Sequence, residues 1–118
     1  MTKLTIQDIS TLDVESGTRL VTALKEHGGD PLHRCGGNAR CTTCRVEFLS
    51  GEPEKITQAE KDKLDSQGNM GKFRLSCQCF VEDAMHVKVL MSFAESGLDD
   101  PGPQPEDQIT PQAVWISK

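Results

Sequence analysis

The sequence predicts one small α+β domain followed by an irregular C-terminal extension. The expected strands are few and short, two short helices interrupt them, and no strand–helix–strand unit repeats. The expected order is strand, strand, helix, strand, helix, strand, strand, which favours a compact mixed structure over a doubly wound parallel sheet. At 118 residues the chain is long enough for one modest hydrophobic core.

Two periodicities locate these elements. Alternation of apolar and polar residues predicts the strands, which we expect at 3–8, 12–14, 45–50, 72–75 and 85–91. Apolar residues at helical spacing predict a first helix over 18–27, which ends at a pair of glycines. A second helix is expected over 57–67, because Thr57 to Glu60 has the sequence of a capping box.

The composition changes after Ser96. Four prolines between positions 101 and 111 interrupt a stretch, 97–118, that has four acidic residues and one basic residue. We therefore expect a domain at 1–96 and a proline-rich, acidic extension at 97–118. The apolar residues 114–116 are expected to pack this extension against the domain, although Trp115 is also a residue type enriched in partner contacts.

The composition also excludes several classes of function. The chain has 13 basic and 18 acidic side chains, whereas nucleic-acid binding depends on a surplus of lysine and arginine. No apolar run is long enough for a transmembrane helix, and the first six residues lack the apolar stretch of a signal peptide. Five cysteines, an odd number, argue against a fully paired disulfide framework. We expect a cytoplasmic protein without a nucleic-acid or membrane partner.

Four cysteines form the most specific motif. Cys35, Cys41 and Cys44 lie within ten residues in a loop of small and polar residues, and Cys77 follows much later. Four thiolates distributed in this way suit the two irons of a 2Fe–2S cluster, which exchanges single electrons. The small residues of the loop allow backbone N–H groups to approach the sulfurs.

Two alternatives concern the identity of the metal and of the fourth ligand. A structural zinc site also uses four thiolates, but common zinc ribbons have a second Cys-x-x-Cys pair, and this chain has a single late cysteine in its place. Cys79 lies two residues after Cys77 and, in an extended segment, would point to the same side. We interpret Cys79 as a small buried apolar residue.

The cysteine segments resemble the 2Fe–2S ferredoxins of the β-grasp fold. Five residues separate the first two cysteines, whereas the plant-type pattern has four. Segments 35–46 and 74–78 look like the adrenodoxin- and putidaredoxin-like branch and its bacterial relatives. Segment 56–65 is similar to the partner-docking helix of that branch. The resemblance covers roughly residues 3–92 and does not include the C-terminal extension.

The resemblance implies a β-grasp (ubiquitin-like) domain, in which one main helix packs across a mixed sheet, with one 2Fe–2S cluster. The arginine-leucine-serine-cysteine-glutamine match at 74–78 implies that Cys77, and not Cys79, is the fourth ligand. No nucleophilic triad or nucleotide fingerprint is present, so we expect an electron carrier and not an enzyme. Its expected partners are a ferredoxin reductase and a terminal oxidoreductase, for example a monooxygenase, both docking transiently on a monomer.

Two further alternatives concern the docking surface and the assembly. Asp62 and Asp65 match acidic positions of the docking helix and share one helix face, but an ordinary solvated surface would have the same pattern. The domain is also compatible with an electron-entry subunit of a larger redox complex, in which the extension forms part of an interface.

Overall fold

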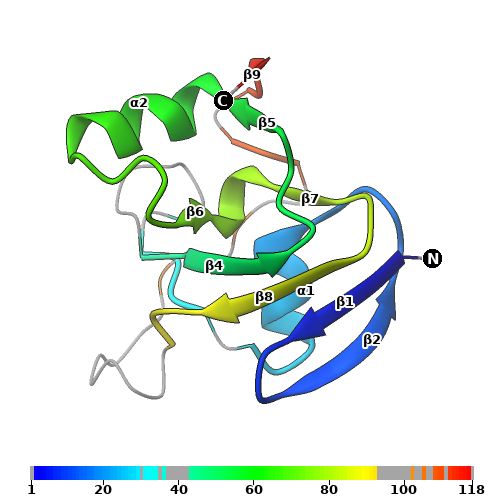
Figure 1. The fold of residues 1–118 in the computed structure, drawn as a ribbon. Coiled ribbons are helices and arrows are strands. Elements are labelled where there is room, and N and C mark those ends of the chain that lie inside the picture. Colours follow the sequence, from blue (N-terminus) through cyan, green and yellow to red (C-terminus); the bar gives the residue numbers. More distant parts are fainter. Residues whose placement is uncertain are drawn as a thin grey trace.

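The computed structural model describes residues 2–29, 31–34, 36, 43–92, 102, 105, 108–110 and 112–117 (Figure 1). In chain order the elements are β1 (Thr2–Ile6), β2 (Ser10–Val14), β3 (Thr18–Arg19), α1 (Leu20–Glu26), β4 (Arg45–Ser50), β5 (Lys55–Thr57), α2 (Gln58–Ser66), β6 (Arg74–Leu75), the 3₁₀ turn η1 (Ser76–Gln78), β7 (Phe80–Val81), β8 (Met85–Val89) and β9 (Trp115–Ser117). No helix in these ranges is long and apolar enough to cross a membrane.

A five-stranded mixed sheet forms the centre of the domain. Its strand order is β2-β1-β8-β4-β6. Within this sheet β1 and the central strand β8 pair in parallel, and the other three pairs are antiparallel. The hairpin expected at the N-terminus is present, with Leu4 opposite Leu12. The predicted mixed sheet is confirmed.

The main core lies between one face of this sheet and α1 (Figure 1). Leu4 and Ile6 alternate with more exposed residues along β1, so one face of the strand is buried, as the period of two predicts. Leu20, Ala23 and Leu24 of α1 contribute to the same apolar cluster. The helix is shorter than expected, because Thr18 and Arg19 pair with β7 before it begins.

A second apolar cluster lies beneath α2. It contains Ile56, Leu64 and Leu75 together with Cys44 and Cys77. Half of the expected capping box forms: the Thr57 hydroxyl accepts a hydrogen bond from the Glu60 backbone N–H at 3.2 Å. The Glu60 side chain does not return to the cap but turns inward to Arg74, so this residue joins α2 to β6.

The C-terminal segment ends in a strand that the sequence alone does not predict. Its residues pair antiparallel with β5, with Ile56 opposite Ile116 (Figure 1). Ile116 also packs against the second apolar cluster, and the Trp115 ring lies 5.9 Å from the Phe80 ring. The expected apolar contact of residues 114–116 with the body of the domain is therefore present, and it takes the form of regular β-pairing.

Gly51 follows β4, and its backbone lies close to Ala84 and Met85 at the start of β8. Replacing Gly51 tests the packing at this point. Its φ is +75°, and a Cβ would lie 2.3 Å from the Ala84 carbonyl oxygen. Gly51→Ala is expected to destabilise the fold by about 1–3 kcal/mol through overpacking, in addition to about 1–2 kcal/mol for the left-handed conformation. Gly68→Ala is the matched control, since Gly68 has φ +69° and nothing within 4 Å of the position that a Cβ would take. The stabilities of the two variants are compared by their urea unfolding midpoints. Equal midpoints would show that the backbone near Gly51 adjusts to the added Cβ without a loss of stability.

Candidate metal centre

Two of the four predicted ligands lie in the described part of the chain, and they are in contact. Cys44 is 2% exposed and Cys77 is fully buried. They pack in the same apolar cluster, close enough for the Cys77 thiol to affect the pKa of Cys44, although 33 positions separate them in the sequence. Cys35 and Cys41 lie outside the described residues. Within the described ranges no group of three or more histidines, cysteines or carboxylates is placed to hold a metal, so those ranges supply two members of the predicted ligand set.

The β4–β6 ladder brings these two cysteines together. Arg45 pairs with Leu75, so the residue before β4 and the residues after β6 lie side by side. Ser76 secures the junction: its backbone N–H and its hydroxyl both donate to the Cys44 carbonyl oxygen, at 3.1 and 2.7 Å. The 3₁₀ turn of η1 then places Cys77 beneath α2.

The electrostatics of this pair fit an iron–sulfur cluster. The hydrogen bond with the Cys77 thiol, together with burial, raises the pKa of the Cys44 thiol well above its ordinary value. Two buried thiolates side by side would repel each other in an apolar cluster, and ferric ions supply the charge that offsets this repulsion. Two soft sulfur donors at one point in a dry environment therefore suit iron of a thiolate-bound cluster.

Cys79 belongs to a different part of the core. It packs in the cluster between the main sheet and α1, whereas Cys77 packs in the cluster beneath α2. The turn at 76–78 separates the two side chains, which would share a side in an extended strand. The Cys79 thiol lies 3.5 Å from the Leu75 carbonyl oxygen, and burial raises its pKa. Its burial agrees with its interpretation as a small apolar residue.

Two buried polar side chains near Cys77 are not among the site residues predicted from the sequence. Arg19 is 1% exposed, and its Nε donates to the Cys77 carbonyl oxygen at 2.7 Å. Gln78 is fully buried, and its Nε2 lies 3.6 Å from the Cys77 sulfur. Arg19 comes directly before the apolar positions of α1, so helical periodicity alone gives no reason to place it inside. The sequence signals for Gln78 are its position next to a predicted ligand and its place in the 74–78 match.

The two predicted docking residues lie on the exposed side of α2. Asp62 and Asp65 are both exposed, whereas Leu64 between them is buried. The Gln58 amide donates to the Asp62 carboxylate at 2.6 Å, an i, i+4 contact along the helix. The helix therefore presents both carboxylates to solvent.

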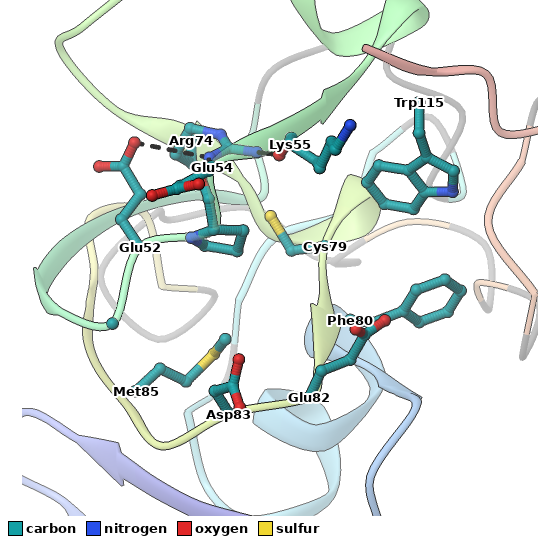
Figure 2. A pocket seen from close by; sticks show the side chains of 12 residues that line it. Glu52, Glu54, Lys55, Arg74, Cys79, Phe80, Glu82, Asp83, Met85 and Trp115 are labelled. Atoms are coloured by element: carbon teal, nitrogen blue, oxygen red, sulfur yellow. Dashed lines mark hydrogen bonds and ion pairs between the residues drawn. The ribbon is translucent and has the colours of Figure 1, made fainter. Parts of the chain in front are cut away.

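A separate cavity of about 650 Å³ lies next to Cys79 (Figure 2). Trp115 and Phe80 line one side, and Arg74 and Glu52, 3.5 Å apart, line another. Neither Cys44 nor Cys77 is among the residues that line it. The cavity is therefore distinct from the paired thiols, and the C-terminal strand forms part of its wall.

The mixed sheet, the helix across it and the buried thiol pair define a small β-grasp domain built around a thiolate-bound metal centre. Residues 4–82 match the family described as 2Fe-2S iron-sulfur cluster binding domain. The chain belongs to this family, and its cofactor is one 2Fe–2S cluster.

Curated relatives include a terpredoxin and F subunits of the Na(+)-translocating NADH-quinone reductase. Terpredoxin of a Pseudomonas species is 30% identical over 80 residues, which cover 63% of this chain and 76% of terpredoxin. The F subunit of the Na(+)-translocating NADH-quinone reductase of Methylococcus capsulatus is 34% identical over 79 residues, which cover 67% of this chain. The match spans only 19% of that larger protein's own length.

Solved structures show the same fold. The ISC-like 2Fe–2S ferredoxin of Pseudomonas putida superposes with a TM-score of 0.61 at 26% identity, covering 75% of this chain and 92% of that one. A chain in the covalent complex of putidaredoxin reductase and putidaredoxin has a TM-score of 0.57 at 30% identity, covering 75% of this chain and 97% of that one. The predicted β-grasp ferredoxin fold is thus confirmed.

Proposed function

We propose that this chain is a one-electron carrier and not an enzyme that converts a substrate. The observation that carries the proposal is the contact between the buried Cys44 and Cys77 thiols at the β4–β6 junction of a 2Fe–2S domain. We infer that Cys35 and Cys41, from the loop that precedes β4, complete the ligand set. The bound cluster supplies reversible one-electron chemistry.

The protein's own residues would hold and insulate this group. Ser76 fixes the backbone of Cys44, and Arg19 fixes the backbone of Cys77. Ile56 and Leu64 exclude water from the sulfurs on the side of α2. Electron transfer needs the cluster close to the docking face, so we propose that partners dock near the cluster ligands.

We infer a reductase as the electron donor and a terminal oxidoreductase, such as a monooxygenase, as the acceptor. Support comes from the match to putidaredoxin in a complex with its reductase and from the match to terpredoxin. The proposal includes a monomer in the cytoplasm, a cluster domain at 1–96 and an extension at 97–118. Docking would be transient, with charge guiding the encounter.

The direct test is reduction of the full-length holoprotein under anaerobic conditions. We expect visible absorption bands that bleach on uptake of one electron per chain and an EPR signal from one unpaired electron. A reductase of the putidaredoxin type, supplied with its nicotinamide donor, serves as the probe partner. A colourless, EPR-silent protein with bound zinc, or a cluster that does not cycle reversibly, would contradict the carrier function.

A second candidate is an electron-entry unit of a larger redox enzyme. It is favoured by the match to the F subunit of the Na(+)-translocating reductase, of which this chain spans about a fifth. Size exclusion of the protein from its native cell distinguishes the two. A monomer that exchanges electrons on collision supports the free carrier, whereas a stable large complex supports the entry unit.

Neutralising the carboxylates of α2 tests the docking surface. Asp62→Asn with Asp65→Asn is expected to reduce reductase turnover at low salt several-fold and to flatten its salt dependence, because screening acts on exposed charges. Asp8→Asn with Asp13→Asn is the matched control in the β1–β2 hairpin. Equal turnover of the α2 variant and the wild type at every salt concentration would show that α2 is an ordinary solvated helix.

A further inference from the structure

Gln78 connects the Cys77 sulfur to the C-terminal segment. Its side chain is fully buried, and its Nε2 lies 3.6 Å from the Cys77 sulfur. The same nitrogen donates to the Thr110 carbonyl oxygen at 2.8 Å. A primary amide has two N–H groups, so one can serve the carbonyl while the other is directed at sulfur.

The orientation of this amide follows from its partners. The Thr110 carbonyl is an acceptor only, so the amide nitrogen and not the oxygen must face it. At the other end the Thr57 hydroxyl accepts from the Glu60 N–H and gives its own proton to the Gln78 Oε1, at 2.7 Å. Both ends of the amide are therefore specified by hydrogen bonds, the one to Thr57 buried and the one to Thr110 partly buried, and the nitrogen faces Cys77.

The Thr110 carbonyl is held in place by the rest of the C-terminal segment. Ile109 is buried, and the Gln58 N–H donates to the Val114 carbonyl at 2.8 Å. β9 then pairs with β5, and its Trp115 packs on Phe80 (Figure 2). This segment begins well after residue 82, where the match to the family ends. One of the two N–H contacts of Gln78 thus depends on a segment outside the residues that match the family.

We propose that the C-terminal segment holds Gln78 as an N–H donor to the Cys77 sulfur and thereby raises the reduction potential of the cluster. The inference rests on the proposed function, since it takes Cys77 as a ligand. The reduced cluster carries one more negative charge than the oxidised one, and an N–H directed at a ligand sulfur stabilises the more negative state. Burial strengthens this effect, because the local dielectric is low. Gln78 is then a positioning residue for the metal centre, and residues 109–110 and 112–117 are its support.

The first test is the reduction potential of full-length holoprotein variants. Gln78→Met keeps the length of the side chain and removes its N–H donors. We expect the ratio of reduced to oxidised protein at a fixed potential to fall about tenfold, which corresponds to about 59 mV for one electron. Gln67→Met changes an exposed glutamine at the end of α2 and is expected to leave the potential unchanged. A Gln78→Met protein with the wild-type spectrum and the wild-type potential would overturn the proposal.

A second variant tests the support from the C-terminal segment without touching Gln78. Trp115→Ala with Ile116→Ser removes the apolar contacts of β9 and adds no charge, and limited proteolysis reports release of the segment. We expect the released variant to have a lower potential, and we expect no further fall when Gln78→Met is added, because both changes interrupt one linkage. A released segment with an unchanged potential, or two falls that simply add, would contradict the role of the segment.

A third measurement needs no variant that must fold. Wild-type protein grown with glutamine labelled with ¹⁵N at the side-chain amide is reduced and examined by pulsed EPR. Coupling of one such nitrogen to the cluster is expected, since only Gln78 lies against a predicted ligand among the described glutamines. A cluster that forms and cycles normally without this coupling would overturn the inference and leave the carrier function intact. Failure of the wild type to form a cluster would overturn both.

Discussion

Replacement of Cys77 by serine is expected to abolish the 2Fe–2S cluster or to change its spectrum strongly, whereas the same replacement at Cys79 is expected to leave the spectrum intact. Cys77 is fully buried in contact with Cys44, in the cluster beneath α2. Changes in the groups that surround metal ligands typically cost about 10–100-fold in metal affinity, and loss of a ligand is expected to cost more.

Cys79→Ser is a closely matched control. The chemical change is the same, the position is only two residues away, and the wild-type thiol is equally inaccessible at 2% exposure. Iron and sulfide per chain, the visible spectrum and the EPR signal of the reduced protein measure the outcome. If Cys79→Ser loses the cluster while Cys77→Ser keeps it, the fourth ligand is Cys79, and the proposed ligand set is wrong.

The second large effect is expected at the buried ion pair between α2 and β6. Arg74 donates to both oxygens of the Glu60 carboxylate, at 2.8 and 3.1 Å, and Glu60 is fully buried. The carboxylate also accepts from the Leu75 N–H at 2.8 Å. Glu60→Gln keeps the size of the side chain but leaves the guanidinium without this charge. We expect a loss of about 3–5 kcal/mol, typical of removing one partner of a buried pair.

Glu54→Gln provides the control, since it makes the same change at an exposed position on the loop before β5. The measurement is the urea concentration at which the cluster absorption and the Trp115 fluorescence are lost. A faster loss of the cluster is expected as well, because Leu75 directly precedes the turn that carries Cys77. Equal midpoints for the two variants would show that Glu52 and the backbone carbonyls near Arg74 are sufficient to stabilise the buried guanidinium charge without Glu60.

The double replacement Glu60→Gln with Arg74→Met separates loss of the pair from exposure of a lone charge. It removes the guanidinium that Glu60→Gln leaves behind. We expect it to be more stable than the sum of its two single variants predicts, with a coupling energy of about 0.5–3 kcal/mol. Strict additivity would show that the two side chains stabilise the fold independently.

Local sequence patterns are sufficient to predict the helices and strands whose residues follow a simple period. Alternation along β1 and the Thr57 cap of α2 are properties of neighbouring residues, and both occur where the sequence predicts them. The short strands are different. β3 and β7 have two residues each, too few for a period, and exist because each lies beside the other. Of the strand expected at 72–75, only Arg74 and Leu75 form β6, because these two residues pair with β4.

The same distinction between local sequence and tertiary structure applies to the metal centre. Its residue types and spacing are local, so the sequence by itself determined that this chain carries thiolates for a 2Fe–2S cluster and which four cysteines are candidates. The tertiary structure decided what surrounds them. The turn at 76–78 sends Cys77 and Cys79 to different clusters, and the pairing of β5 with β9 brings the Thr110 carbonyl to Gln78. The β5–β9 pairing and the Gln78–Thr110 contact join residues tens of positions apart. Their geometry depends on the packing of the whole chain, which a local sequence pattern does not contain.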